Sequence, residues 1–101
     1  HFHKKQSDFW FCPSGNLEAV LFDRRENSKT AGETMKIPLG EFSSKAILIP
    51  PGVAHGYRVL GEKAAGLIYL VDAEYDSQNP DEGRIAHDDP EINFDWSTLP
   101  R

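Results

Sequence analysis

The sequence is poor in cysteine, in basic charge and in long apolar runs. Its single cysteine, Cys12, cannot form an intramolecular disulfide, so a reducing compartment is expected. Eleven Lys and Arg against sixteen Asp and Glu give a net charge of −5, which leaves no basic field to attract nucleic acid. No apolar run approaches the ~18 residues that a membrane span needs. We therefore expect a cytoplasmic protein that binds neither nucleic acid nor membrane.

The length and apolar content indicate one small domain. The 101 residues are 39% hydrophobic, which is enough for one core and excludes a two-domain enzyme. The first residue is histidine rather than methionine, so we expect the sequence to be truncated at its N-terminus. The whole chain, 1–101, is predicted as one domain with a barrel core over 1–71 and a surface-wrapping tail over 72–101.

The apolar pattern predicts strands, because it alternates with a period of two and shows no helical stripe. Asp8–Cys12 and Leu17–Asp23 flank a Pro-Ser-Gly-Asn turn, which predicts a hairpin. The alternating segment Met35–Leu39 contains a proline and is predicted as an edge strand. Three further strands are expected at Lys45–Pro50, His55–Leu60 and Ala64–Val71, the last of them central, with a bulge or close backbone approach near Gly66.

The acidic residues are concentrated at the end of the sequence. Nine of the sixteen lie between Asp72 and Arg101, together with three prolines, which is typical of a segment that wraps a surface. Six short strands before it favour a closed or double-sheet architecture without exposed edges. The predicted fold is all-β, a jelly-roll barrel with a proline-rich acidic C-terminal tail, whose interior holds side chains or one small ligand.

Three histidines are the strongest chemical signal. On an extended strand His1 and His3 project to the same side, and His55 follows the Pro-Pro-Gly turn at a strand start. With Gln6 they could surround one cavity, and imidazoles serve as general bases or as metal ligands. A purely structural role, in a frayed end and a turn, is the alternative.

Tyrosine and arginine supply further candidates. Tyr57, Tyr69 and Tyr75 could each donate a phenolic proton, and Tyr69 is favoured because it lies in the most apolar strand. Arg25 ends a strand beside Asp23, where a guanidinium could bind a phosphate or carboxylate, or simply form part of a solvated charge cluster.

Five motifs occur in one order along nearly the whole chain: HF with a following Q, DRRENSKTAG, PPGVAHGY, YLVDAEY and DDPEINFDW. In this order they resemble the dTDP-4-dehydrorhamnose 3,5-epimerase family of cupin-like barrels. That resemblance implies a cupin-like double-stranded β-helix and a nucleotide-linked sugar as the ligand. It also implies an activity that removes a proton beside the 4-keto group of a dTDP-4-keto-6-deoxyhexose and returns one on the opposite face, without metal or organic cofactor.

The resemblance assigns roles to individual residues. His1 matches the family's base, with His3 as the alternative because the alignment there depends on a gap, and Tyr69 matches the general acid. The remaining matches imply substrate contacts and, together with the candidates above, give a predicted binding set of His3, Gln6, Arg25, His55, Tyr57 and Tyr75.

Two positions depart from the family pattern. Asp8 stands where the family has a lysine that helps to hold the oxyanion, so the charge is inverted. The distal aspartate that partners the base in the family is absent from the stretch 97–101.

Two other functions stay open, and we also expect a homodimer. A metal-binding cupin would use His1, His3, Gln6 and His55 as ligands, with glutamine in place of the carboxylate. A relative that binds a sugar nucleotide without turnover is the second alternative. The homodimer is expected because an apolar edge such as Met35, Ile37 and Leu39 is best covered by another chain.

Overall fold

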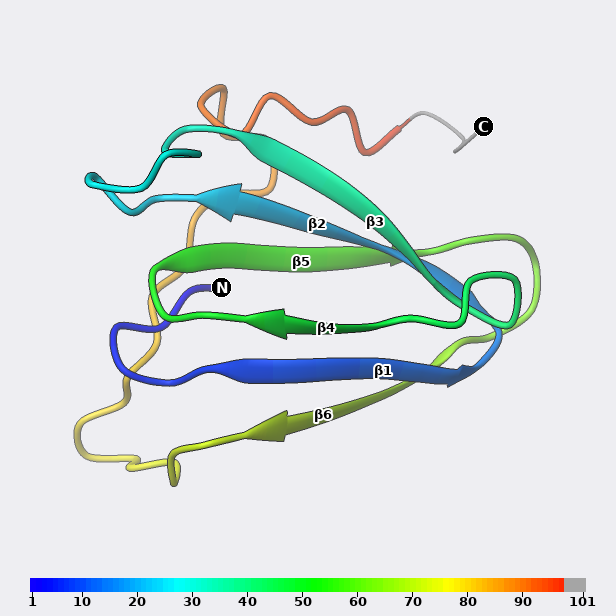
Figure 1. The fold of residues 1–101 in the computed structure, drawn as a ribbon, viewed down its shortest axis with the longest axis horizontal. Coiled ribbons are helices and arrows are strands. Elements are labelled where there is room, and N and C mark those ends of the chain that lie inside the picture. The colour runs from blue at the N-terminus through cyan, green and yellow to red at the C-terminus, as the bar shows by residue number, and fades with distance from the viewer. Residues whose placement is uncertain (98–101) are drawn as a thin grey trace.

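The computed structural model describes residues 1–97, which form six strands in two three-stranded antiparallel sheets (Figure 1). One sheet has the order β4-β1-β6 and the other β3-β2-β5. The described part contains no helix, and so none that could cross a membrane. The all-β prediction is therefore confirmed. The strands are β1 (Asp8–Ser14), β2 (Asn16–Asp23), β3 (Thr34–Gly40), β4 (Ala46–Ile49), β5 (Val53–Val59) and β6 (Gly66–Val71).

The core lies between the two sheets, because alternate residues of each strand point inward. In β1 the buried positions Asp8, Trp10 and Cys12 alternate with the exposed Phe9 and Phe11. The main apolar cluster contains side chains from both sheets, which pack against one another. It consists of Trp10, Cys12, Leu17, Ala19, Leu39, Ile49 and Val53.

The predicted hairpin between the first two strands is wrong, because β1 and β2 belong to different sheets. The chain crosses from one sheet to the other at Gly15, which has a φ of 68°. A β-carbon there would lie 2.4 Å from the carbonyl oxygen of Ala64, so only glycine fits this crossing. The Pro-Ser-Gly-Asn segment does turn the chain, but it connects the two sheets rather than two paired strands.

The most apolar strand, β6, is an edge strand and not the central one predicted, since it pairs with β1 alone. On one face of β6, Leu67 and Tyr69 line a cavity. On the other face, Ile68 and Leu70 are exposed at the surface. The irregularity expected near Gly66 is confirmed: the β1–β6 register shifts between Phe11 and Ser14, and Ser14 pairs with Gly66. The predicted edge position of β3 is confirmed as well, because β3 pairs with β2 alone.

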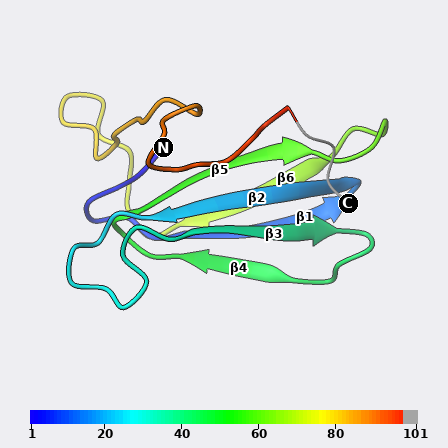
Figure 2. The same ribbon diagram turned by 90° about the horizontal axis from the view of Figure 1, so that it is seen from above.

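The acidic tail runs along the outer face of the β3-β2-β5 sheet, beside β5 (Figure 2). There Ile92 is buried with Phe22 and Ala54, which form a second apolar cluster. Arg58 on β5 forms an ion pair with Glu18 and donates a hydrogen bond to the carbonyl of Trp96. The end of the predicted tail, 98–101, lies outside the described residues.

Candidate functional site

The segment before β1 is held beside β5 by backbone hydrogen bonds. The His55 amide donates to the His1 carbonyl at 2.8 Å, and the Gly52 amide donates to the His3 carbonyl at 2.8 Å. On its other side Phe2 forms a β-bridge with Gly83 of the tail. Residues 1–3 are thus fixed between β5 and the tail, which fixes the positions of both histidines.

Asp81 organises the next few residues. Its carboxylate accepts hydrogen bonds from the backbone amides of Lys4, Lys5 and Gln6 at 2.8–3.0 Å. These bonds, led by the one from Lys4, lower the pKa of Asp81 and keep it ionised. Three consecutive amides on one carboxylate fix the turn that delivers Gln6 and Asp8 to the interior.

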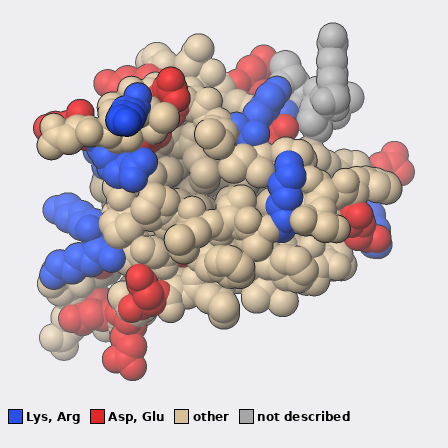
Figure 3. Space-filling model, in the orientation of Figure 1, with Lys and Arg blue, Asp and Glu red and all other residues tan. Residues whose placement is uncertain are grey.

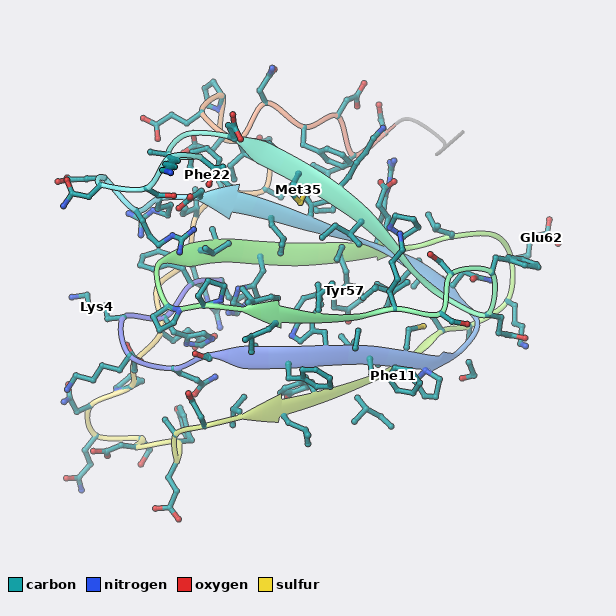
Figure 4. All side chains as sticks on the ribbon, viewed as in Figure 1. Lys4, Phe11, Phe22, Met35, Tyr57 and Glu62 are labelled. Carbon is teal, nitrogen blue, oxygen red and sulfur yellow. The ribbon has the colours of Figure 1, made fainter. Side chains whose placement is uncertain are left out.

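A cavity of about 330 Å³ opens between the sheets at this end of the barrel. Tyr57 extends into it from β5 toward the opposite sheet (Figure 4). Six of the eight residues predicted for the site line it: His1, His3, Gln6, His55, Tyr57 and Tyr69. The other lining residues are Asp8, Trp10, Gly56, Leu67 and Glu82.

Asp8 is the centre of the site and is only 5% exposed. Gln6 Nε2 donates to its Oδ1 at 2.8 Å, and Trp10 Nε1 donates to its Oδ2 at 3.3 Å. His3 Nε2 lies 3.9 Å from Oδ1, and His55 Nε2 lies 3.5 Å from Oδ2. The residue that inverts the family's lysine charge is thus surrounded by two neutral donors and two imidazoles.

His55 is buried against aromatic side chains. Its ring meets Trp10 edge-on at a centroid distance of 5.3 Å and lies 5.4 Å from the ring of His3. Burial lowers the pKa of His55 below its ordinary value, although the Val53 carbonyl and Asp8 oppose this shift. The ring is therefore neutral at pH 7.

His1 occupies the open side of the cavity, and its Nδ1 contacts a carboxylate oxygen of Glu82. The half-exposed ring is thereby oriented with Nδ1 toward the carboxylate, so Nε2 is the nitrogen that would meet a substrate. This is the arrangement of a histidine base and its orienting acid. The carboxylate comes from the tail, next to the Phe2–Gly83 bridge.

Tyr69 belongs to the sheet opposite His1. It lies across from Trp10 in the β1–β6 register, so both side chains point to the same face, which lines the cavity. Because His1 is bonded to β5 and Tyr69 lies on β6, the imidazole and the phenol come from opposite walls. Tyr57 lines the same space and packs edge-on against Trp10 at 5.9 Å.

Two predicted residues lie elsewhere. Tyr75 is 77% exposed and does not line the cavity. Arg25 lines a separate pocket and pairs with Asp23, with Nε to Oδ1 at 2.9 Å and Nη2 to Oδ2 at 3.0 Å. The structure thus brings neither of them to the histidines.

Sequence reasoning missed three contributors to the site: Glu82, Asp81 and Trp10. Glu82 and Asp81 stand in a polar tail about eighty residues from their partners, and no local pattern reveals such a pairing. Trp10 could have been found, because it shares strand parity with Asp8 two residues earlier.

Two antiparallel sheets closed around a cavity of histidines, a buried carboxylate and tyrosines define a cupin-like β-barrel with a polar binding site. The family model for dTDP-4-dehydrorhamnose 3,5-epimerase matches residues 1–101, and the chain belongs to this family. The resemblance found in the motifs and the cupin-like barrel fold are both confirmed.

Solved structures and curated relatives agree with this assignment. The crystal structure of a dTDP sugar isomerase from Desulfovibrio desulfuricans G20 superposes with a TM-score of 0.88 at 27% identity, covering 98% of this chain and 62% of that one. The spore coat polysaccharide biosynthesis protein SpsL of Bacillus subtilis is 51% identical over 97% of this chain and 65% of its own length. The probable low-salt glycan biosynthesis epimerase Agl13 of Haloferax volcanii is 37% identical over 91% of this chain and 59% of its own length. The chain spans less than two thirds of each.

Proposed function

We propose that the protein epimerises a nucleotide-linked 4-keto-6-deoxyhexose, with His1 as the base and Tyr69 as the acid. The observation that supports this most directly is the pairing of a carboxylate-held imidazole with a phenol on the facing wall of one cavity. Inversion at carbon requires a base on one face of the ring and an acid on the other. The remaining lining residues then contact the sugar.

The reaction is a proton exchange without net redox change. Nε2 of neutral His1 takes the proton from the carbon beside the ketone, and Glu82 stabilises the imidazolium that results. The C–H bonding electrons move into the enolate. Its collapse takes a proton from the Tyr69 hydroxyl on the opposite face, and solvent restores both groups.

A second cavity supports a nucleotide-linked substrate. It measures about 340 Å³ and shares His1, His55, Gly56 and Tyr57 with the first, so the two are adjacent. Trp96 and His87 of the tail line it, and aromatic rings of this kind stack on nucleobases. In this proposal the sugar occupies the first cavity and the nucleotide the second. A solved Legionella pneumophila epimerase with a TM-score of 0.79 and 26% identity, matched over 95% of this chain and 50% of its own, is in complex with dTDP-4-keto-L-rhamnose.

Deuterium incorporation tests the proposal. The protein is incubated with a dTDP-4-keto-6-deoxyhexose in D₂O, and exchange at C3 and C5 is followed by NMR. We expect exchange at one or both carbons, lowered at least 100-fold in His1→Asn and retained in the control Glu26→Gln, at an exposed position of the loop between β2 and β3. Tyr69→Phe keeps the first proton abstraction but loses inverted product. Absence of exchange in the unaltered protein would favour a relative that binds without turnover.

We further propose that the chain pairs with a second copy through the outer face of the β4-β1-β6 sheet. This face is largely uncharged in its middle (Figure 3) and exposes Phe9, Phe11, Leu48, Ile68 and Leu70. The edge expected to pair, in β3, is less suited because Leu39 is buried in the core. Light scattering on the protein as it elutes from a size-exclusion column should give twice the chain mass, and Leu48→Lys should shift this mass toward that of the monomer.

The cytoplasmic location stays a prediction.

A further inference from the structure

Beyond the proton-transfer groups, the cavity contains a compact cluster of potential ligand atoms. His3, Asp8 and His55 each offer one atom, and these atoms lie within 4.8 Å of one another. Asp8 and His55 are buried, and the side chain of His3 is 13% exposed. Two imidazoles and one carboxylate form a donor set that divalent transition metals bind.

Backbone contacts orient both imidazoles in the same way. Nδ1 of His3 contacts the Asp81 carbonyl, and Nδ1 of His55 lies 3.1 Å from the Val53 carbonyl. A carbonyl can only accept, so each Nδ1 carries the proton and each Nε2 is the nitrogen that faces Asp8. The Gln6 amide nitrogen also lies 3.5 Å from His3 Nε2, so a metal ion would replace this long contact. Histidines that ligate metals are typically held by such a bond on the other ring nitrogen.

The distances leave room for an ion between these atoms. The two Nε2 atoms lie 3.5 Å and 3.9 Å from the Asp8 oxygens, which is longer than a charge-assisted hydrogen bond. Around a tetrahedral ion with bonds of about 2.0–2.1 Å, ligand atoms are about 3.3 Å apart. His3 faces Oδ1 and His55 faces Oδ2, and the three ligand atoms lie within 4.8 Å of one another. Side-chain movements of up to about 1.5 Å would therefore complete the coordination.

The carboxylate is held in place for this role. Gln6 donates to one Asp8 oxygen and Trp10 to the other, so each oxygen keeps a lone pair for a further partner. We propose that His3, Asp8 and His55 bind one divalent transition-metal ion of the zinc class, with its remaining positions open to the cavity. This ligand set differs from the one expected from sequence, because Gln6 orients the carboxylate and His1 is engaged with Glu82.

The ion would also account for the inverted charge at Asp8, a point that rests on the proposed function. Among residues 1–97, no lysine or arginine lines the cavity, although an enolate needs positive charge or strong donors nearby. A bound divalent cation beside Asp8 would supply that charge in place of the family's lysine. The metal would then polarise the ketone, while His1 and Tyr69 still transfer the protons.

Metal binding is measured directly and without sugar. The protein is stripped with EDTA, dialysed and titrated with Zn²⁺ by calorimetry, and Co²⁺ binding is followed by visible absorption. We expect one equivalent bound with micromolar or tighter affinity, at least 100-fold weaker in His55→Gln and in Asp8→Asn. The matched control His87→Asn should bind like the unaltered protein.

A second variant distinguishes the loss of a metal ligand from a loss of folding. His3→Gln alters a ligand on the segment before β1 rather than in the core, and its circular dichroism should match that of the unaltered protein while Zn²⁺ binding is lost. Absence of stoichiometric binding, or binding that His3→Gln and Asp8→Asn both leave unchanged, would overturn the proposal. Because no substrate is present, this result is independent of the deuterium-exchange test.

Discussion

Two buried aspartates, Asp8 at the start of β1 and Asp23 at the end of β2, have opposite surroundings. Asp23 accepts hydrogen bonds from the Arg25 side chain and amide, from Ser28 and from Thr30, at 2.6–3.0 Å. Asp8 accepts one bond at 2.8 Å and one at 3.3 Å, and in the described part of the chain it has no arginine or lysine partner. The first carboxylate is fully satisfied and its charge is compensated; the second has capacity for another partner.

Asp23 therefore serves the structure, whereas Asp8 is the aspartate available to the proposed site. Asp23 and its partners close the loop between β2 and β3, where the Gly32 amide also donates to the Asp23 carbonyl at 2.8 Å. The motif that contains Asp23 is easily seen in the sequence, but the hydrogen bonds of its carboxylate all hold the loop in place. The incompletely satisfied Asp8 lies among the histidines, where a ligand or ion can bind.

The largest effect is expected from removing the satisfied aspartate. Asp23→Ala removes the acceptor for all these donors and should lower the free energy of unfolding by about 3 kcal/mol. Urea denaturation measures this loss, and Asp88→Ala, at an exposed tail aspartate, is the matched control. A change below about 1 kcal/mol would show that the loop does not depend on Asp23.

A third carboxylate, Glu82, extends the comparison because it serves one half-exposed histidine. Glu82→Gln keeps an acceptor for His1 Nδ1 but removes the charge that stabilises the imidazolium. We expect proton exchange to fall about tenfold, because the imidazolium formed in the reaction loses its neighbouring negative charge. An unchanged exchange rate would assign Glu82 to structure alone.

The loss of folding stability in acid should come largely from Asp23. The hydrogen bonds from Arg25 hold the pKa of Asp23 far below its ordinary value. The unfolded chain therefore takes up the proton first, so this stabilisation is complete above about pH 5 and is lost as the pH falls below about 4. Stability measured between pH 6 and 3 should fall less steeply in Asp23→Asn. Equal slopes would contradict the assignment.

The smallest effect is expected at the incompletely satisfied aspartate. In Asp8→Asn the amide oxygen still accepts from Gln6 or Trp10, so the free energy of unfolding without metal should change by less than about 1 kcal/mol. Thermal unfolding in EDTA measures it. A loss as large as that of Asp23→Ala would make Asp8 a structural residue and remove the contrast.

The sequence predicted the strands better than their partners. Alternating segments and short apolar runs bounded by turn residues located all six strands, because both patterns follow from burial of strand faces. It could not show that β1 pairs with β4 and β6 rather than β2, because the crossing at Gly15 depends on contact with Ala64. In the same way His1, His3 and His55 could be named from their motifs, whereas Glu82 and Asp81 depend on the path of the tail.

The β1–β6 pairing has a consequence for folding kinetics. Phe9 is opposite Leu70, and Phe2 bridges Gly83, so the cavity joins segments about sixty to eighty residues apart. Closing such long loops costs chain entropy before the contacts between the segments stabilise the fold. Topologies dominated by such contacts therefore fold in milliseconds to seconds. The binding cavity should therefore be among the last parts to assemble and the first to open. A ligand held between its two walls would slow unfolding of the whole barrel.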